Sequence, residues 1–520
     1  MSTHILPAQP SLPSKTAEAT HVQRKISFEV IALGFIIVLC ASLRFYHLGA
    51  ASLWSDEIFS RYYLDIFGLH YVLTDGLSRE TNPPTYYLLL RGWIALFGDG
   101  EAALRSLSAA ASILCIPVTY LLGRELGGKS RGIAGALLFA LCPASLYFAQ
   151  ETRVYALLMF VATVLLWAAA LYQRDPRSVK ATTLYFLSAT LCLYLHATGL
   201  LLVVACWGAV WLYFLSNGAS TRQARFKWMV LNGFVLLLGL PYFLHVFTAS
   251  HTGIIDYMPP AGIHQFVYCA SLVVSGMVTP YPWPGFLLAA AMFLTLAVSV
   301  WLQPLSRRAS VTLIGVPCLF IALVLLVSFR RPILMPRILV WTVVPLCLIA
   351  ANQILAAGRA RFAVLLGLVA TFGTGLYFQV TAPNSDKEPW REISRELGPE
   401  LDQADLVVLS PVSNPMVLRY YAPRVKNVRL WDESVNPTIM SDAAKRLHIA
   451  SISEPEILQA IQTKHSVWVL SHSFDLDRVN DLRSQVPATV FREWFCGKVP
   501  CAAAAGWQPL PQLPAPGLSK

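Results

Sequence analysis

Three separate segments of the chain, and one isolated histidine, carry residues that could act as a base or bind an anion. The first is the segment LWSDEIFSRYY, which places Asp56 and Glu57 side by side among aromatic residues. A carboxylate can accept a proton from an attacking hydroxyl group, so an acidic pair suits general base catalysis. The same residues also suit the first turn of a helix capped by Ser55, where acids favour the positive end of the helix dipole. Spacing alone leaves both interpretations open.

The second point is the segment AQETRVYALL, with Glu151, Arg153 and Tyr155 between two apolar stretches. Charged groups at the edge of a membrane are unfavourable unless they are paired or used, because lipid does not solvate them. Glu151 and Arg153 therefore either neutralise each other or belong to a site. His196 follows another apolar stretch and is either a satisfied interfacial residue or part of the same site.

The third point is the segment FRRPILMPRIL, which contains Arg330, Arg331 and Arg337. Arginine offers forked hydrogen-bond donors and keeps its charge in an apolar environment, so three guanidinium groups suit a phosphate. The alternative is that these side chains extend toward lipid headgroups.

The composition of the chain indicates a membrane protein. Of its 520 residues, 56% are hydrophobic and only 13% are charged, which does not suit a water-soluble surface. The formal net charge is +11, but lysine and arginine occur as short clusters between apolar runs, without a basic stripe or a platform for stacking bases. The charge therefore indicates orientation in a membrane and excludes nucleic acid as the expected partner.

Eleven stretches are apolar enough to span a membrane, for which about 20 residues are needed. They centre near residues 28–46, 105–122, 132–148, 154–171, 182–196, 198–215, 228–248, 284–302, 311–329, 337–355 and 362–380. Two shorter runs, Pro84 to Phe97 and Phe266 to Val278, are expected to lie in the outer interface. The basic clusters near 124–131, 174–180, 222–227, 307–308 and 359–361 then share the side of the N-terminus, which the positive-inside rule assigns to the cytoplasm.

This topology predicts three parts. Residues 1–27 form a cytoplasmic tail, residues 28–380 a transmembrane catalytic domain with its first outer loop at 47–104, and residues 381–520 a small periplasmic α/β domain. In the last part, EPWREISREL and EPEILQAIQTK predict helices, and DLVVLS and SVWVLSHS predict strands. Eight cysteines lie in or beside apolar segments, whereas Cys496 and Cys501 lie in the exported part, where they are candidates for a disulfide.

The candidate residues all fall on the outer face in this topology. Carboxylates, arginines and aromatic side chains in a site open to lipid suit the transfer of a sugar from a polyprenyl-phosphate carrier. In that reaction a carboxylate takes the proton of an acceptor hydroxyl as the oxygen attacks the anomeric carbon, while cations hold the departing lipid phosphate.

Several segments in series resemble the GT-C glycosyltransferases of the protein O-mannosyltransferase type, a group that includes the lipid A aminoarabinose transferases. They are RFYHLGAASLWSDE, NPPTYYLLLRGWIALFGDGEAALRSLSA, YLLGRELGG, QETRVYALL, LYLHATGLL and PRILVWTVVP, within about residues 30 to 350. The resemblance implies an inverting enzyme of the bacterial inner membrane with its active site on the outer face. It also implies that Asp56 is the base, and that Arg337 contacts the donor phosphate.

The resulting candidate site consists of two catalytic residues, Asp56 and Glu57, and a donor-binding set: Arg330, Arg331, Arg337, Glu151, Arg153, Tyr155 and His196. Asn82 before the double proline and Ile338 after Arg337 depart from the pattern of the family. These departures leave the sugar and the acceptor undetermined.

Two further expectations concern a metal and a competing function. Some related enzymes hold a divalent cation between loop carboxylates, and Asp56 and Glu151 would supply oxygen ligands for Mg²⁺ or Mn²⁺, although nothing in the sequence requires one. The alternative function is a polytopic transporter or flippase, which should show inverted repeats and ionisable groups near the membrane midplane. The charged candidates gather at one face instead, which favours the enzyme.

Overall fold

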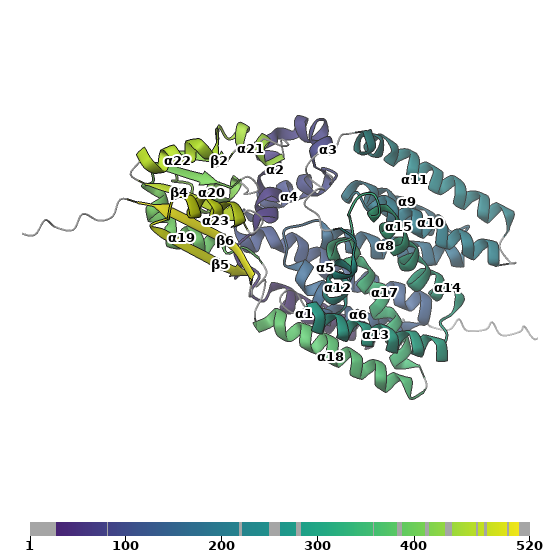
Figure 1. The fold of residues 1–520 in the computed structure, drawn as a ribbon. Helices are drawn as coiled ribbons and strands as arrows, with labels where there is room; N and C mark the ends of the chain where they lie inside the picture. The colour runs from purple at the N-terminus through teal and green to yellow at the C-terminus, as the bar shows by residue number, and fades with distance from the viewer. Residues whose placement is uncertain are drawn as a thin grey trace, which may run out of the picture.

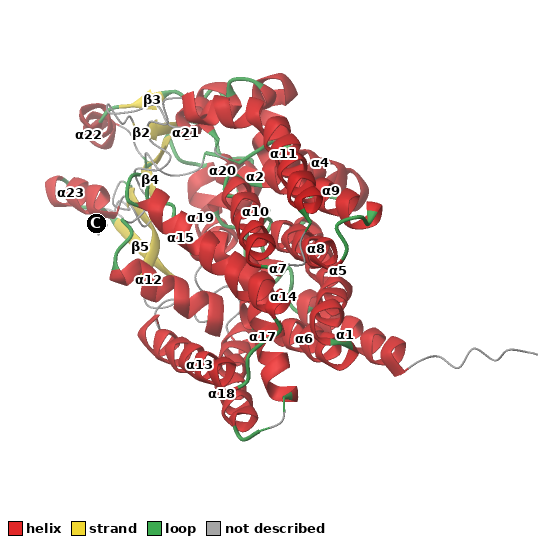
Figure 2. Ribbon diagram, turned by 90° about the vertical axis from the view of Figure 1, so that its right-hand side faces the viewer, coloured by secondary structure: helices red, strands yellow, loops and turns green. Residues whose placement is uncertain are grey.

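The computed structural model describes residues 28–80, 82–217, 221–248, 260–276, 282–356, 358–381, 387–410, 415–431, 439–463, 466–472, 476–496 and 499–508. The tail predicted at residues 1–27 lies outside the described residues. A large helical bundle and a smaller α/β domain lie side by side, and the strands are confined to one side of the molecule (Figures 1 and 2).

The first half of the bundle runs through eleven helices. They are α1 (Phe28–Phe45), α2 (Ser55–Leu73), α3 (Gly76–Arg79), α4 (Thr85–Phe97), α5 (Glu101–Gly127), α6 (Lys129–Leu141), α7 (Pro143–Ala149), α8 (Tyr155–Arg174), α9 (Val179–Leu195), α10 (Gly199–Ser216) and α11 (Arg222–Thr248).

The second half contains several short helical turns beside its long helices. Its elements are α12 (Ile263–Ala270), η1 (Ser271–Ser275), α13 (Pro282–Leu302), α14 (Arg307–Ser310), η2 (Val311–Gly315), α15 (Val316–Ser328), α16 (Pro336–Leu339), η3 (Val340–Thr342), α17 (Val343–Leu355) and α18 (Ala360–Thr381).

All eleven predicted spans fall on helices of this bundle. Within the described ranges, nine helices are long and apolar enough to cross a membrane, and the bent pair α6–α7 would make a tenth. The remaining predicted span corresponds to α9, an apolar helix of 17 residues. The two runs expected in the interface form α4 and the pair α12–η1. The predicted architecture, mostly helical and polytopic with a C-terminal α/β domain, is confirmed.

The stretch near 132–148 is bent, whereas the sequence suggested one continuous span. The chain direction bends by 59° between helices α6 and α7. Pro143 lacks a backbone N–H and restricts Cys142 to an extended conformation, with φ −68° and ψ 119°. The carbonyl of Ala140, near the end of α6, accepts a hydrogen bond of 2.6 Å from the buried guanidinium of Arg44, which also donates to the carbonyl of Phe139 at 3.3 Å. Arg44 thereby supplies donors that the broken helix lacks.

The C-terminal domain is built on a six-stranded sheet with the order β3-β2-β1-β4-β6-β5. Strands β3, β2, β1 and β4 are parallel, and β6 runs antiparallel to both β4 and β5. The strands are β1 (Leu406–Leu409), β2 (Val428–Trp431), β3 (Ser451–Ile452), β4 (Val467–His472), β5 (Val490–Cys496) and β6 (Val499–Trp507). The helices are α19 (Trp390–Asp402), α20 (Met416–Tyr421), α21 (Ile439–Arg446), α22 (Glu454–Thr463) and α23 (Leu476–Gln485).

The elements predicted in this domain are present as α19, β1, α22 and β4. The candidate disulfide between Cys496 and Cys501 is also present, and it joins the last residue of β5 to the third residue of β6. Small residues in β6 let the sheet core close, because a Cβ atom at Gly506 would lie 2.9 Å from the ring of Trp468.

The α/β domain is fastened to the loop that precedes α2. The hydroxyl of Tyr421 accepts a hydrogen bond from Leu53 N at 2.6 Å, and it donates to Glu101 at 2.5 Å. Ser52 donates to the carbonyl of Glu388 at 2.7 Å. These contacts set the start of α2, where the first acidic pair lies.

Candidate active site

Asp56 lies between two arginines that come from distant parts of the chain. Its Oδ2 atom is 3.2 Å from Nη1 of Arg337 and 3.5 Å from Nη2 of Arg153. Arg153 precedes α8, and Arg337 is the second residue of α16, 281 positions after Asp56. The Asp56 side chain is 32% exposed, so its carboxylate is paired and still accessible. The structure therefore brings together the predicted base and two of the predicted phosphate ligands.

Tyr155 and His196 complete this cluster. The guanidinium carbons of Arg153 and Arg337 lie 5.8 and 6.0 Å from the centre of the Tyr155 ring. The same ring is 5.9 Å from the ring of His196, the residue that follows α9. The backbone N–H of Thr198 donates to Nδ1 of His196 at 3.1 Å, so a neutral imidazole carries its hydrogen on Nε2. We call Asp56, Arg153, Tyr155, His196 and Arg337 the outer cluster.

Glu57 lies beside Asp56 in a different environment. Its carboxylate is fully buried and accepts two hydrogen bonds from Arg105, at 2.9 and 2.7 Å, and one from the backbone N–H of Thr152 at 2.7 Å. Burial alone would raise the pKa of Glu57, but the charges of Arg105 and Lys387 and these hydrogen bonds outweigh it and lower the pKa to about 2. We interpret Glu57 as a positioning residue that holds the first turn of α2.

Glu151 turns toward the α/β domain. It is buried, and its Oε1 atom lies 3.8 Å from Nζ of Lys387. Lys387 is also 3.8 Å from Oε2 of Glu57 and donates to the carbonyl of Gln150 at 3.2 Å. Glu151 thus pairs with Lys387, whereas Arg153 pairs with Asp56. The first outer loop, the second outer loop and the C-terminal domain meet at this lysine.

Arg330 and Arg331 do not join the outer cluster. Both are exposed in the turn that follows α15, and their side chains form no ion pair or hydrogen bond with the part of the chain that the structure describes. Their predicted role in donor binding stays a prediction.

Sequence reasoning missed Arg105 and Lys387. Arg105 opens a predicted span, and an arginine inside an apolar stretch is a signal of a buried partner that could have been followed. Lys387 has no comparable signal, because lysine is common at the start of a soluble domain.

Glu388 was also missed, and it changes the interpretation of Ser55. The Glu388 carboxylate accepts hydrogen bonds from Ser55 N at 3.1 Å, from Ser55 Oγ at 2.7 Å and from Trp390 Nε1 at 2.6 Å, and it pairs with His472. Burial opposes ionisation, yet the charge of His472 and these bonds lower the pKa of Glu388. Ser55 was expected to cap α2, but the cap position is Trp54 and the Ser55 hydroxyl binds Glu388.

Glu80 lies close enough to the outer cluster for Arg153 and Asp56 to act on its charge. Its Oε1 atom accepts hydrogen bonds from Asn82 N at 2.9 Å and from Asn82 Nδ2 at 2.7 Å. Burial raises the pKa of the Glu80 carboxyl, although the charge of Arg153 opposes this shift. Asn82, the departure before the double proline, therefore has a structural role in holding Glu80.

The predicted divalent cation would be held by Asp56 and Glu151. No group of three His, Cys, Asp or Glu side chains within the described ranges is close enough to hold a metal ion. Asp56 already pairs with two arginines, and Glu151 with Lys387, so both predicted ligands are neutralised by side chains. We derive no step of the reaction through a metal, and the divalent cation stays a prediction.

Comparisons with known proteins agree with this fold. Residues 81–245 match the family model described as dolichyl-phosphate-mannose-protein mannosyltransferase. The structure of ArnT from Cupriavidus metallidurans in the apo state aligns with a TM-score of 0.60 and 13% identity, over 91% of this chain and 98% of that one. The same protein bound to undecaprenyl phosphate aligns with a TM-score of 0.57 and 12% identity, over 91% and 97%. No curated protein matches the sequence.

Proposed function

We propose that this chain, which has the GT-C fold of ArnT, is a membrane glycosyltransferase that transfers a sugar from a polyprenyl-phosphate donor to an acceptor hydroxyl. One observation carries the proposal: Asp56 lies within 3.5 Å of both Arg153 and Arg337, so a base and two phosphate ligands are within reach of one sugar phosphate. The match of residues 81–245 to a mannosyltransferase family supports it. So does the binding of undecaprenyl phosphate by a protein of the same fold.

The donor phosphate would bind the guanidinium groups of Arg337 and Arg153, which offer forked donors to its oxygens. It thereby competes with Asp56 for both cations and leaves the Asp56 carboxylate free to accept a proton. Asp56 then takes the proton of the acceptor hydroxyl while the hydroxyl oxygen forms a bond to the anomeric carbon. The bond from that carbon to the phosphate oxygen breaks, and the arginines stabilise the charge on the departing lipid phosphate. Attack opposite the leaving group inverts the anomeric centre.

The residues around Asp56 would set its position without touching the reacting atoms. Glu57 and Arg105 anchor the first turn of α2 from inside, while Glu388 holds Ser55 from the α/β domain. Tyr155 lies within about 6 Å of both guanidinium groups and would limit their side-chain freedom. Preorganised donors of this kind favour the transition state because they need not reorient during the reaction.

The site is proposed to face the outer side of a bacterial cytoplasmic membrane, in line with the distribution of basic loops. The acceptor hydroxyl would belong to a protein, a lipid or a glycan. A transporter is the weaker alternative, because Asp56 and its arginine partners precede or begin helices instead of lying in the middle of spans.

The test is the Asp56→Asn variant, assayed for transfer of radiolabelled sugar from a lipid-phosphate donor. We expect a loss of about 10²- to 10⁴-fold in turnover, the usual contribution of a positioned base. Asp99→Asn is the matched control, because Asp99 is an exposed acid on the same loop and pairs with Arg61, away from the cluster. Full turnover in Asp56→Asn would rule out Asp56 as the base. Mass spectrometry of lipid that copurifies with the wild-type protein would identify the sugar.

A further inference from the structure

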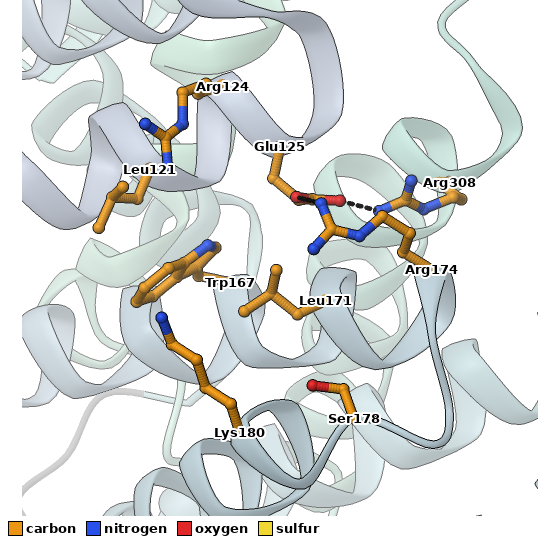
Figure 3. A pocket seen from close by; sticks show the side chains of 9 residues that line it. All are labelled: Leu121, Arg124, Glu125, Trp167, Leu171, Arg174, Ser178, Lys180 and Arg308. Atoms are coloured by element: carbon orange, nitrogen blue, oxygen red, sulfur yellow. Dashed lines mark hydrogen bonds and ion pairs between the residues drawn. The ribbon is translucent and has the colours of Figure 1, made fainter. Parts of the chain in front are cut away.

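A second charged site lies at the opposite end of α8 from the outer cluster. A cavity of about 430 Å³ is lined there by four cations from four elements, Arg124 of α5, Arg174 of α8, Lys180 of α9 and Arg308 of α14 (Figure 3). Tyr155 begins α8 and Arg174 ends it, and a helix of 20 residues is about 30 Å long. The cavity is therefore separate from the proposed donor site, and its function does not depend on that proposal.

The cavity has more positive charge than its own residues neutralise. Glu125 is the one acid among the lining residues, and it pairs with both Arg174 and Arg308. Nε of Arg308 is buried and has no hydrogen-bond partner within the described residues. Arg124 and Lys180 are exposed, and their cationic groups lie near the rings of Tyr120 and Trp167, at 5.4 and 5.8 Å. Arg124 and Lys180 are therefore available to an external anion.

An apolar surface leads away from these cations along the flanking helices. On α9, Leu187 and Leu191 follow Lys180 at helical spacing on one face and are 58% and 39% exposed. On α5, Leu121 lines the cavity, and Leu114, seven residues earlier on the same face, is 54% exposed. Helices α5 and α8 are long and apolar enough to cross a membrane, and α9 is a shorter apolar helix beside them. We therefore place these exposed leucines in the hydrocarbon region of the membrane.

We propose that the cavity binds the phosphate headgroup of an anionic phospholipid whose acyl chains lie along the exposed faces of α9 and α5. Phosphate oxygens match the exposed donors of Arg124 and Lys180. The adjoining leucines match acyl chains, whereas a soluble phosphate would leave them without a partner. Basic pockets between membrane helices are known to favour such headgroups. The lipid would belong to the leaflet opposite the active site.

The test is a lipid titration of the full-length protein by native mass spectrometry in detergent. Cardiolipin, phosphatidylglycerol and zwitterionic phosphatidylethanolamine are added separately, and inorganic phosphate is added in a fourth series. We expect the anionic lipids to bind more tightly than phosphatidylethanolamine. The double variant Arg124→Gln/Lys180→Gln should bind them about thirtyfold more weakly, at about 1 kcal/mol for each charge removed.

Two control variants make the result decisive. Arg359→Gln/Arg361→Gln removes two exposed charges at the start of α18, outside the cavity, and should leave lipid affinity unchanged. Arg124→Lys/Lys180→Arg keeps both charges and should retain binding, which would show that the positive charges are what the lipid recognises. Equal affinity for anionic and zwitterionic lipids would overturn the proposal. So would equal weakening of lipid binding in Arg124→Gln/Lys180→Gln and Arg359→Gln/Arg361→Gln. Displacement of the bound lipid by millimolar inorganic phosphate would overturn the lipid assignment in favour of a free phosphate.

Discussion

The two ends of α8 carry the same arrangement of charges in different surroundings. At the outer end Asp56 lies between Arg153 and Arg337, and at the other end Glu125 lies between Arg174 and Arg308. Outside this common core, the outer end balances its further cations, Arg105 and Lys387, with the buried acids Glu57 and Glu151. The opposite end has Arg124 and Lys180 without such acids in the cavity.

This difference in charge balance implies a difference in use. At the outer end a phosphate gains its arginines only by taking them from Asp56, so donor binding would release the base at the moment it is needed. At the opposite end the unmatched cations can hold an anion while Glu125 keeps both of its partners. The balanced charges at the outer end suit a donor that binds and leaves in each reaction cycle. The excess of cations at the opposite end suits an anion that stays bound.

The largest expected effect concerns the placement of the two ends on opposite membrane faces. Cysteine introduced at Lys129, which is exposed at the start of α6, should react with an impermeant thiol reagent only after the membrane is opened. Cysteine introduced at Gln403, exposed after α19, should react in intact cells. A Cys318→Ser background removes the one exposed free thiol of the described residues. Labelling of both positions from the same side would contradict the placement of the two ends of α8 on opposite faces of the membrane.

The next prediction compares how much Glu57 at the outer end and Glu125 at the opposite end contribute to the stability of the fold. Glu57→Gln leaves Arg105 buried without its counter-charge, which should lower the free energy of unfolding by about 3–5 kcal/mol. Glu125→Gln should lower it by only about 1 kcal/mol, because Arg174 and Arg308 reach solvent. Unfolding titrations in mixed micelles measure both. Similar losses in the two variants would contradict the proposed anchoring role of Glu57.

The pH dependence sharpens the same contrast. The folded-state pKa of Glu57 is lowered to about 2 from an ordinary value of 4.5, so its ion pair stabilises the fold above about pH 4.5. That contribution, about 3 kcal/mol, is lost as the pH falls from 4.5 toward 2. The difference in stability between wild type and Glu57→Gln should therefore shrink between pH 6 and pH 3. A constant difference over this range would mean that the carboxylate is not held ionised.

The last prediction concerns the affinity of Arg337 for the donor. Arg337→Ala should weaken donor binding about thirtyfold, which corresponds to about 2 kcal/mol for one charged hydrogen-bonding partner. Arg307→Ala is the matched control, because Arg307 is an exposed arginine that donates to the carbonyl of Ser216 and lies outside both clusters. Donor affinity is measured by equilibrium binding of the labelled lipid-phosphate sugar. Unchanged affinity in Arg337→Ala would remove this residue from the proposed phosphate site.

Local features of the sequence determined much of this protein. Long apolar stretches must form helices in a membrane, because backbone groups there can only bond within the segment, and all eleven predicted stretches are helical. In the C-terminal domain, the alternating and helical patterns of apolar residues were sufficient to predict α19, β1, α22 and β4. Asp56, Arg153 and Arg337 were recognisable because their residue types suit the chemistry and the topology puts them on one face.

Only the tertiary structure decided which charges meet. Asp56 and Arg337 are 281 positions apart, and nothing local indicates that Arg337 reaches this carboxylate while Arg330 and Arg331 remain exposed. Glu57, adjacent to Asp56 in sequence, is buried against Arg105 because successive helical residues point in different directions. The roles of Lys387 and Glu388 depend on how a separate domain packs on α2. Charge pairing is set by distances between packed elements, and such distances are not encoded in the spacing of residues along the chain.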